Sequence, residues 1–221
     1  MLGHNNGPPI DEPTDRGGLE RAYSWRQAHK AVWRTPSVEV VKIRTRAAEQ
    51  LGLSYRDYTS ILMDRGRAPN ALVFELAGTL VRTRNNEIAI DNRGDVMLMP
   101  GVREKLSRLG DCSVFVIGTQ ARVREGSLSA SDFETCVQQV SEQTGRAITD
   151  HCLGDTGDTK NPTRLPAPAT VLQLLNKYLL PPARAVLIGD TVAHEECALR
   201  ASLARFIWSW RYFADPLPAP A

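Results

Sequence analysis

The sequence lacks the features that mark a membrane, secreted or zinc-stabilised protein. Its four cysteines are far apart and form no C-x-x-C pair, which argues against both a disulfide framework and a structural zinc site. No apolar run approaches the roughly 20 residues that cross a bilayer. The first residues carry neither the basic nor the apolar segment of a signal peptide. These absences predict a cytoplasmic protein without a membrane partner.

The sequence also has little net charge. The balance is +2, so composition alone does not indicate a nucleic-acid-binding protein. The charge is, however, unevenly distributed. Residues 20–68 hold ten basic and five acidic side chains, a net charge of +5, which leaves −3 for the rest. We therefore expect a basic amino-terminal region followed by a mildly acidic remainder.

Composition divides the chain into four parts. Residues 1–18 hold Gly, Pro, Asn and Asp with little to bury, and residues 213–221 are rich in Pro and Ala, so both are predicted to be flexible. Residues 19–68 have helical spacing of apolar residues, interrupted at Pro36, Gly52 and Gly66. This region is predicted to be a small all-α domain of three helices, and residues 69–212 to be a separate domain.

Residues 44–63 fit the spacing of a helix-turn-helix unit, with Gly52 in the turn and Ser54 as the amino-terminal cap of the second helix. In that interpretation the second helix enters the major groove and flanking basic residues contact phosphates. The candidate nucleic-acid contacts are Arg44, Arg46, Ser54, Tyr55, Arg56, Thr59 and Ser60. The same helix pair is also typical of a docking or dimerisation module. A protein partner, a second copy of the chain and DNA therefore all stay open as partners.

In residues 69–212, short apolar runs alternate with longer amphipathic stretches. Runs at 71–74, 112–117, 185–188 and 205–208 are predicted strands, and Trp208 and Trp210 are expected to point the same way on the last one. The alternation predicts an α/β fold, a parallel sheet with helices on both faces. In such sheets the active site lies at the carboxyl ends of the strands.

Four segments in this region carry a resemblance to a known family. They are Ala71-Leu-Val-Phe-Glu-Leu-Ala-Gly-Thr-Leu-Val81, Val114-Phe-Val-Ile-Gly-Thr-Gln120, Thr163-Arg-Leu-Pro-Ala-Pro168 and Val186-Leu-Ile-Gly-Asp190. In order, they resemble D-x-D-G-T-L, a strand ending in T-N-Q, C-R-K-P-x-P and a strand ending in G-D. These are motifs of the haloacid-dehalogenase superfamily, in the branch of histidinol-phosphate phosphatase and polynucleotide 3′-phosphatase. The resemblance implies a Rossmann-like parallel sheet flanked by helices.

The resemblance also assigns roles to the first motif. In the family its first Asp attacks phosphorus and its second protonates the leaving group. Those positions hold Glu75 and Ala77 here. The extra methylene of Glu75 displaces the attacking oxygen by roughly 1 Å, and misplacement of that size costs on the order of a hundredfold in rate. Ala77 has no proton to donate, although Gly78 and Thr79 of the turn are kept.

The positions that would hold the transferring phosphoryl group are changed as well. The hydroxyl of the second motif falls at Gly118, and the neighbouring Thr119 leaves the strand in another direction. The lysine of the third motif falls at Leu165; Arg164 keeps a positive charge beside it, and Lys160 matches only in a shifted alignment. These losses predict a pseudophosphatase that works as a binding or regulatory scaffold through its basic helical region.

The family's magnesium ion would be weakly held at best. Glu75, Asp190 and Glu195 are the candidate ligands, and magnesium requires oxygen atoms in octahedral geometry. His194 stands where many members have a second acid, but His194 and Glu195 are expected to be solvated, and Asp190 is equally typical of a helix cap. Two alternatives stay open: a slow magnesium-dependent phosphatase using Glu75 and Asp190, and a DNA-binding regulator whose degenerate pocket senses a phosphorylated ligand.

Overall fold

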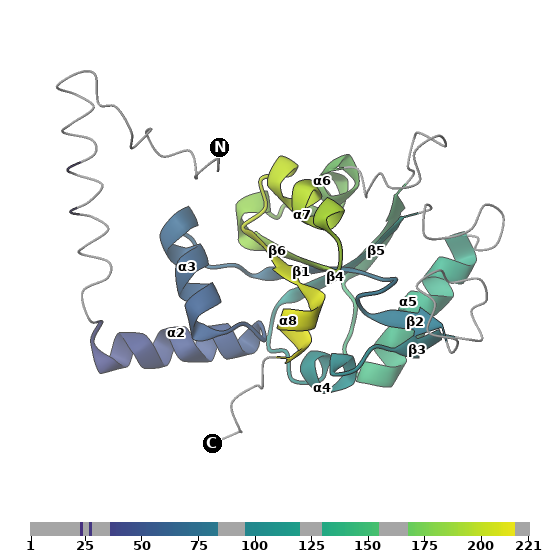
Figure 1. Ribbon diagram of the computed structural model, residues 1–221, viewed down its shortest axis with the longest axis horizontal. Helices are drawn as coiled ribbons and strands as arrows, with labels where there is room; N and C mark the ends of the chain where they lie inside the picture. Colours follow the sequence, from purple (N-terminus) through teal and green to yellow (C-terminus); the bar gives the residue numbers. More distant parts are fainter. Residues whose placement is uncertain are drawn as a thin grey trace. The chain divides into compact units, whose positions relative to one another are not determined.

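The computed structural model describes residues 36–83, 96–119, 130–154 and 168–214, together with the helical residues Tyr23 and Gln27 (Figure 1). The predicted arm, Arg164 and Leu165 lie outside the described residues, as does the predicted tail from residue 215 onward. By compactness the chain divides into residues 1–45 and 46–221. Helix α2 (Val38–Gln50) crosses this boundary, and helix α3 (Tyr55–Arg65) belongs to the second unit.

Helix α3 has the caps expected from the sequence. Ser54 has extended backbone angles, φ −67° and ψ 151°, and its side chain accepts a hydrogen bond from the backbone N–H of Asp57. Gly66 ends the helix at φ 65°, a left-handed conformation that glycine adopts without a Cβ clash. Both predicted ends of α3 are thereby confirmed.

A five-stranded parallel sheet forms the centre of the second unit. Its strands lie in the order β5-β4-β1-β6-β7. Their bounds are β1 Ala71–Glu75, β4 Ser113–Thr119, β5 Asp150–Gly154, β6 Ala185–Gly189 and β7 Arg205–Trp208. Each strand pairs with its neighbours in parallel. A two-stranded antiparallel ribbon, β2 (Val81–Thr83) and β3 (Val96–Leu98), follows the end of β1. The predicted α/β fold is confirmed.

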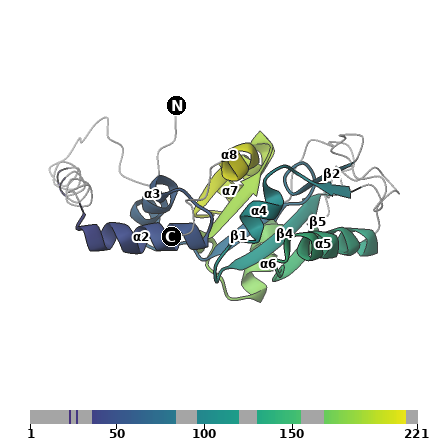
Figure 2. The same cartoon turned by 90° about the horizontal axis from the view of Figure 1, so that it is seen from below.

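Helices cover both faces of the sheet. They are α4 (Val102–Leu106), α5 (Ala130–Thr144), α6 (Pro168–Lys177), α7 (Val192–Arg200) and α8 (Ser209–Ala214), with a short 3-10 turn at Pro182–Arg184. Alternate residues of β1 enter two cores: Leu72 and Phe74 pack with α3, α4, α5 and α8, and Ala71 and Val73 pack with α6 and α7. The two layers are visible on opposite sides of the sheet in Figure 1 and from below in Figure 2.

Hydrogen bonds connect α3 and the turn before it to the end of the sheet domain. Arg211 of α8 donates from Nη2 to both Asp57 oxygens, at 3.0 and 2.9 Å. The Tyr212 hydroxyl donates to the Leu51 carbonyl at 2.9 Å, and Arg65 donates to the Leu203 carbonyl at 2.7 Å. The predicted all-α domain of residues 19–68 includes α3, and in the structure α3 shares one hydrophobic core with the sheet.

Two features near the carboxyl terminus differ from expectation. The last strand ends at Trp208, and the chain turns directly into α8 at Ser209, so Trp210 lies on a helix and is 68% exposed. Phe213 and Ala214, placed in the flexible tail by composition, are the last residues of that helix. Among the described residues, no helix combines the length and the apolar character needed to cross a membrane.

Candidate functional site

Three neighbouring strands bring the motif residues to one edge of the sheet. Strand β1 ends at Glu75, β4 ends at Thr119 after Gly118, and β6 ends at Gly189 before Asp190. Because β1 lies between β4 and β6 and all run in parallel, their carboxyl ends meet. The structure therefore brings the first, second and fourth motifs together.

The turn after Glu75 keeps the shape that its glycine allows. Gly78 has φ 79°, and its N–H donates to the Val81 carbonyl at 2.8 Å. The N–H groups of Leu80 and Val81 both donate to the Leu76 carbonyl at 3.0 Å. The turn is thus a closed, hydrogen-bonded unit that directs the chain from β1 into β2.

His194 lies between the two carboxylates that the family would use. Its Nε2 is 3.6 Å from Glu75 Oε2, and its Nδ1 is 3.3 Å from Asp190 Oδ1. The exposed fractions of the three side chains are 2% for His194, 0% for Glu75 and 16% for Asp190. The expectation of a solvated His194 is therefore wrong: the first turn of α7 packs against the end of β6 and directs this side chain inward.

The imidazole is held by groups on its own segment. The Asp190 backbone N–H donates to Nδ1 at 3.3 Å, and the Thr191 Oγ1 lies 3.0 Å from the same nitrogen. This set of contacts favours the tautomer with hydrogen on Nε2, which faces Glu75. Thr191 also caps α7 by accepting from the His194 N–H, so the capping role expected of Asp190 belongs to Thr191.

Gly189 makes room for this ring. A Cβ at position 189 would lie 2.7 Å from both Cβ and Nδ1 of His194, closer than real Cβ atoms approach other atoms. The glycine of the G-D motif therefore has a packing role here, because a larger residue would force the imidazole out of its position.

A buried thiol lies in the neighbourhood of Glu75. Burial, with a further contribution from the negative charge of Glu75, raises the pKa of Cys197 to about 12. Cys197 is 1% exposed and belongs to the core under α7. Glu75 therefore borders the packed core under α7 as well as the imidazole of His194.

The described residues around Glu75 and Asp190 do not fit magnesium as they are arranged. The metal requires a near-octahedral set of oxygen ligands at about 2.0–2.1 Å, and the His194 ring stands between the two carboxylates that would provide them. Glu195, the third candidate ligand, is exposed on α7. Within the described ranges, no group of three or more His, Cys, Asp or Glu residues is arranged to hold a metal ion.

Phe133 of α5 covers the strand end where the family places a phosphoryl-binding hydroxyl. A Cβ at Gly118 would overlap the Phe133 Cε2 atom, so the ring rests directly on the glycine backbone. Phe133 is 2% exposed, and its ring also contacts His151 at 5.6 Å between centroids. The Thr119 side chain, Arg164 and Leu165 fall outside the described residues.

The candidate nucleic-acid residues do not share one exposed face. Arg46 and Arg56 are exposed, whereas Thr59 is 6% exposed and faces the core. The Ser54 hydroxyl donates to Asp57 Oδ2 at 2.7 Å and is therefore engaged in capping. The others, Arg44, Tyr55 and Ser60, are half-buried. Two of the positions expected to face a groove are thus used by the fold itself.

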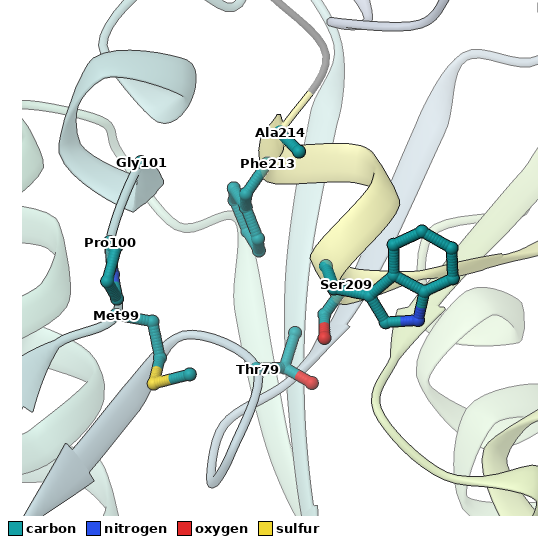
Figure 3. A pocket seen from close by; sticks show the side chains of 8 residues that line it. Thr79, Met99, Pro100, Gly101, Ser209, Phe213 and Ala214 are labelled. Atoms are coloured by element: carbon teal, nitrogen blue, oxygen red, sulfur yellow. The ribbon is translucent and has the colours of Figure 1, made fainter.

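A separate cleft of about 370 Å³, which the sequence did not indicate, lies beside α8 (Figure 3). Its lining is Thr79, Met99, Pro100, Gly101, Ser209, Trp210, Phe213 and Ala214. Figure 3 shows the 99–101 segment on one side and Ser209 and Phe213 on the other. The Thr79 hydroxyl is buried without a hydrogen-bond partner among the described residues. None of the described residues that line the cleft is charged, so this part of the lining offers no cation to bind phosphate.

Solved structures show what the arrangement resembles. D,D-heptose 1,7-bisphosphate phosphatase from B. bronchiseptica, solved with magnesium and phosphate, is 15% identical over 62% of this chain and 78% of its own, with a TM-score of 0.52. The fold of this chain is therefore similar to the fold of that phosphatase. At this identity the likeness establishes the fold, and the chemistry must be judged from the residues.

Two further solved structures, a phosphatase and a hydrolase, match with lower TM-scores. The heptose bisphosphate phosphatase of Burkholderia thailandensis is 13% identical over 61% of this chain and 74% of its own, with a TM-score of 0.44. A haloacid-dehalogenase-superfamily hydrolase of Geobacter sulfurreducens is 16% identical over 63% of this chain and 95% of its own, with a TM-score of 0.42. No protein-family model and no curated protein matches the sequence.

Proposed function

We propose that this protein is a phosphatase-like scaffold that does not hydrolyse phosphate esters and acts by binding a partner. The observation that carries the proposal is the burial of Glu75, whose side chain is 0% exposed. A nucleophile must approach within about 3–3.5 Å of the reacting phosphorus, which a buried carboxylate cannot do without rearrangement of the residues above it.

Two further positions support the same conclusion. The methyl side chain of Ala77 cannot protonate a leaving group. An alkoxide would therefore have to depart without general-acid catalysis, which typically contributes a factor of about 10² to 10⁴ in rate. The Phe133 ring rests on Gly118, where a hydroxyl would have to hold the phosphoryl group. Nucleophile, acid and phosphoryl-binding positions are therefore each unsuited to hydrolysis.

Helix α2 is the part of the basic region that supports partner binding. Within the described residues it buries only Ala48, and it exposes the apolar side chains of Val38 and Ile43, 68% and 66% exposed. The basic residues Lys42 and Arg46 are exposed on the same helix. A helix that offers apolar and basic groups together suits a protein partner with an acidic, partly apolar surface.

The test is phosphate release from a panel of phosphate monoesters that includes a 3′-phosphorylated oligonucleotide. Full-length protein at high concentration is assayed with magnesium beside Glu75→Ala and Asp190→Ala. We expect no release above that of the two variants. Turnover that needs magnesium and disappears in both variants would overturn the proposal in favour of a slow phosphatase in which Glu75 is the nucleophile.

A gel-shift titration with duplex DNA at several salt concentrations distinguishes a DNA partner from a protein partner. A protein that contacts several phosphates loses affinity steeply as salt rises, because binding releases condensed counterions. We expect no DNA complex at low salt. A salt-sensitive complex would replace the protein partner by DNA and would favour the alternative of a DNA-binding regulator.

A further inference from the structure

We propose that His194 closes a latent divalent-cation site: its imidazole fills the place between Glu75 and Asp190 that a cation would otherwise occupy. The wild-type protein then binds no cation there, and removing the ring opens the site. The inference rests on the proposed function, a scaffold that needs no metal. It explains how Glu75 and Asp190 can lie near each other without a bound cation. Its test measures metal binding, so it stands or falls separately from hydrolysis.

The geometry shows a one-to-one correspondence between ring nitrogens and carboxylates. Nε2 faces Glu75 at 3.6 Å and Nδ1 faces Asp190 at 3.3 Å, so a single planar group spans the gap between the two acids. A cation that bridged the same carboxylates would have to stand in that gap. His194 is 1% exposed, so the ring lies in the interior and away from bulk water.

The ring position is specified by its surroundings. Three groups of the strand-to-helix junction hold it: the Asp190 N–H and the Thr191 hydroxyl contact Nδ1, and Gly189 provides the open backbone against which the ring lies. A side chain held in this way does not swing out to admit a cation without losing these contacts. The closed state is therefore built into the junction.

Loss of the ring leaves two buried or half-buried carboxylates facing a cavity. Two carboxylates that face the same space repel each other, and a cation that enters the space relieves this repulsion. Both supply oxygen donors, the ligand type that magnesium and manganese prefer. A ligand that binds the folded state alone also raises its stability. The His194→Ala protein should therefore become cation-dependent.

The experiment is a titration of full-length protein with Mn²⁺, read from the loss of the free-ion paramagnetic resonance signal. We expect no site in the wild type at submillimolar Mn²⁺ and one site in His194→Ala, from which Mg²⁺ competes. Magnesium at about ten times its dissociation constant should raise the Tm of His194→Ala by about 4 °C and leave the wild type unchanged. His194→Ala combined with Asp190→Asn should lose the site.

Three further variants serve as a partial opening of the site, a control and a substitute in the Mn²⁺ titration. Gly189→Ala pushes the ring aside without removing it and should open the site in part, whereas Glu196→Gln on the exposed side of α7 should behave as the wild type. If His194→Ala does not fold, His194→Asn is titrated in its place. A folded His194 variant that binds no Mn²⁺ would overturn the proposal, as would a wild-type site that Glu75→Ala abolishes.

Discussion

Among the described residues of the unit 46–221, the buried carboxylates are those of Asp57 and Glu75, and their surroundings differ. Asp57 is 3% exposed and receives hydrogen bonds from Arg211 at both oxygens and from the Ser54 hydroxyl, with Arg205 3.7 Å away. Glu75 is 0% exposed and lies against the imidazole of His194, with the Cys197 thiol in its electrostatic neighbourhood.

The difference teaches what each carboxylate is for. Burying a charge is costly unless cations and hydrogen-bond donors replace the lost water, and two arginines with a hydroxyl do so for Asp57. Its role is to join α3 to the end of the sheet domain. Glu75 instead lies at the carboxyl end of a parallel strand, where α/β folds place active sites, and its neighbour is the His194 ring. The Asp57 site is structural, and the Glu75 site is the one that we propose has lost its reaction.

The largest effect is expected from breaking the Asp57 site. Asp57→Ala leaves Arg211 and Arg205 without their common acceptor and weakens the cap of α3. Since the two arginine side chains are 42% and 33% exposed, water relieves part of the loss, and we expect a decrease of about 3 kcal/mol in the free energy of unfolding. Urea denaturation measures it, with the exposed Asp64→Ala as the matched control. Equal stability of the two variants would contradict the structural role.

A smaller effect is expected from Gly118→Ala. The added Cβ would overlap the Phe133 ring, and overpacking of this kind costs about 1–3 kcal/mol. In a Phe133→Ala background the same change should cost less than about 0.5 kcal/mol, because the obstructing ring is gone. Urea denaturation of the four proteins forms a double-mutant cycle. Additive costs would show that Phe133 does not cover Gly118.

The smallest expected effect is a change in the pKa of Cys197, the thiol near Glu75. Because burial and the Glu75 charge raise the pKa of Cys197 to about 12, its thiolate is absent at about pH 8, and labelling by iodoacetamide should begin only at much higher pH or on unfolding. Burial is the larger cause, so Glu75→Gln should lower the pKa of Cys197 only slightly. Mass spectrometry of the labelled peptides across pH reports this.

The half-buried Cys112 and Cys152 serve as internal references in that experiment. Burial raises the pKa of both thiols as well, but reagent reaches them more readily. We expect both to be labelled before Cys197. Rapid labelling of Cys197 near neutral pH would mean that its surroundings open to water, and the contrast between the two carboxylate sites would then weaken.

Much of the fold could be predicted because its signals are local. Strands β1, β4 and β6 each contain an uninterrupted apolar run, as expected for strands buried on both faces. Helix α3 is capped by Ser54 and Gly66, as the Ser54 side chain and the backbone freedom of glycine predict. Strand β5 was missed because Asp150 and His151 break its apolar pattern at the edge of the sheet.

The candidate site was predictable only in part. Motif order placed Glu75, Gly118 and Asp190 at neighbouring strand ends, because strand ends follow from the α/β topology. The two side chains that alter the site, His194 and Phe133, come from helices packed against those ends. The only sequence signal for His194 was its place four residues after Asp190, and no signal indicated that Phe133 would rest on Gly118.

The sequence by itself determined the alternation of strands and helices, the turns and caps, and which chemical groups are missing from the strand ends. These follow from short-range backbone preferences and from the polarity of individual residues. Only the tertiary structure decided that α3 shares its core with the sheet, that Glu75 is buried and that His194 stands between two carboxylates. Those outcomes depend on how helices pack over strands distant in sequence, where the presence or absence of one Cβ decides which side chain fills a space.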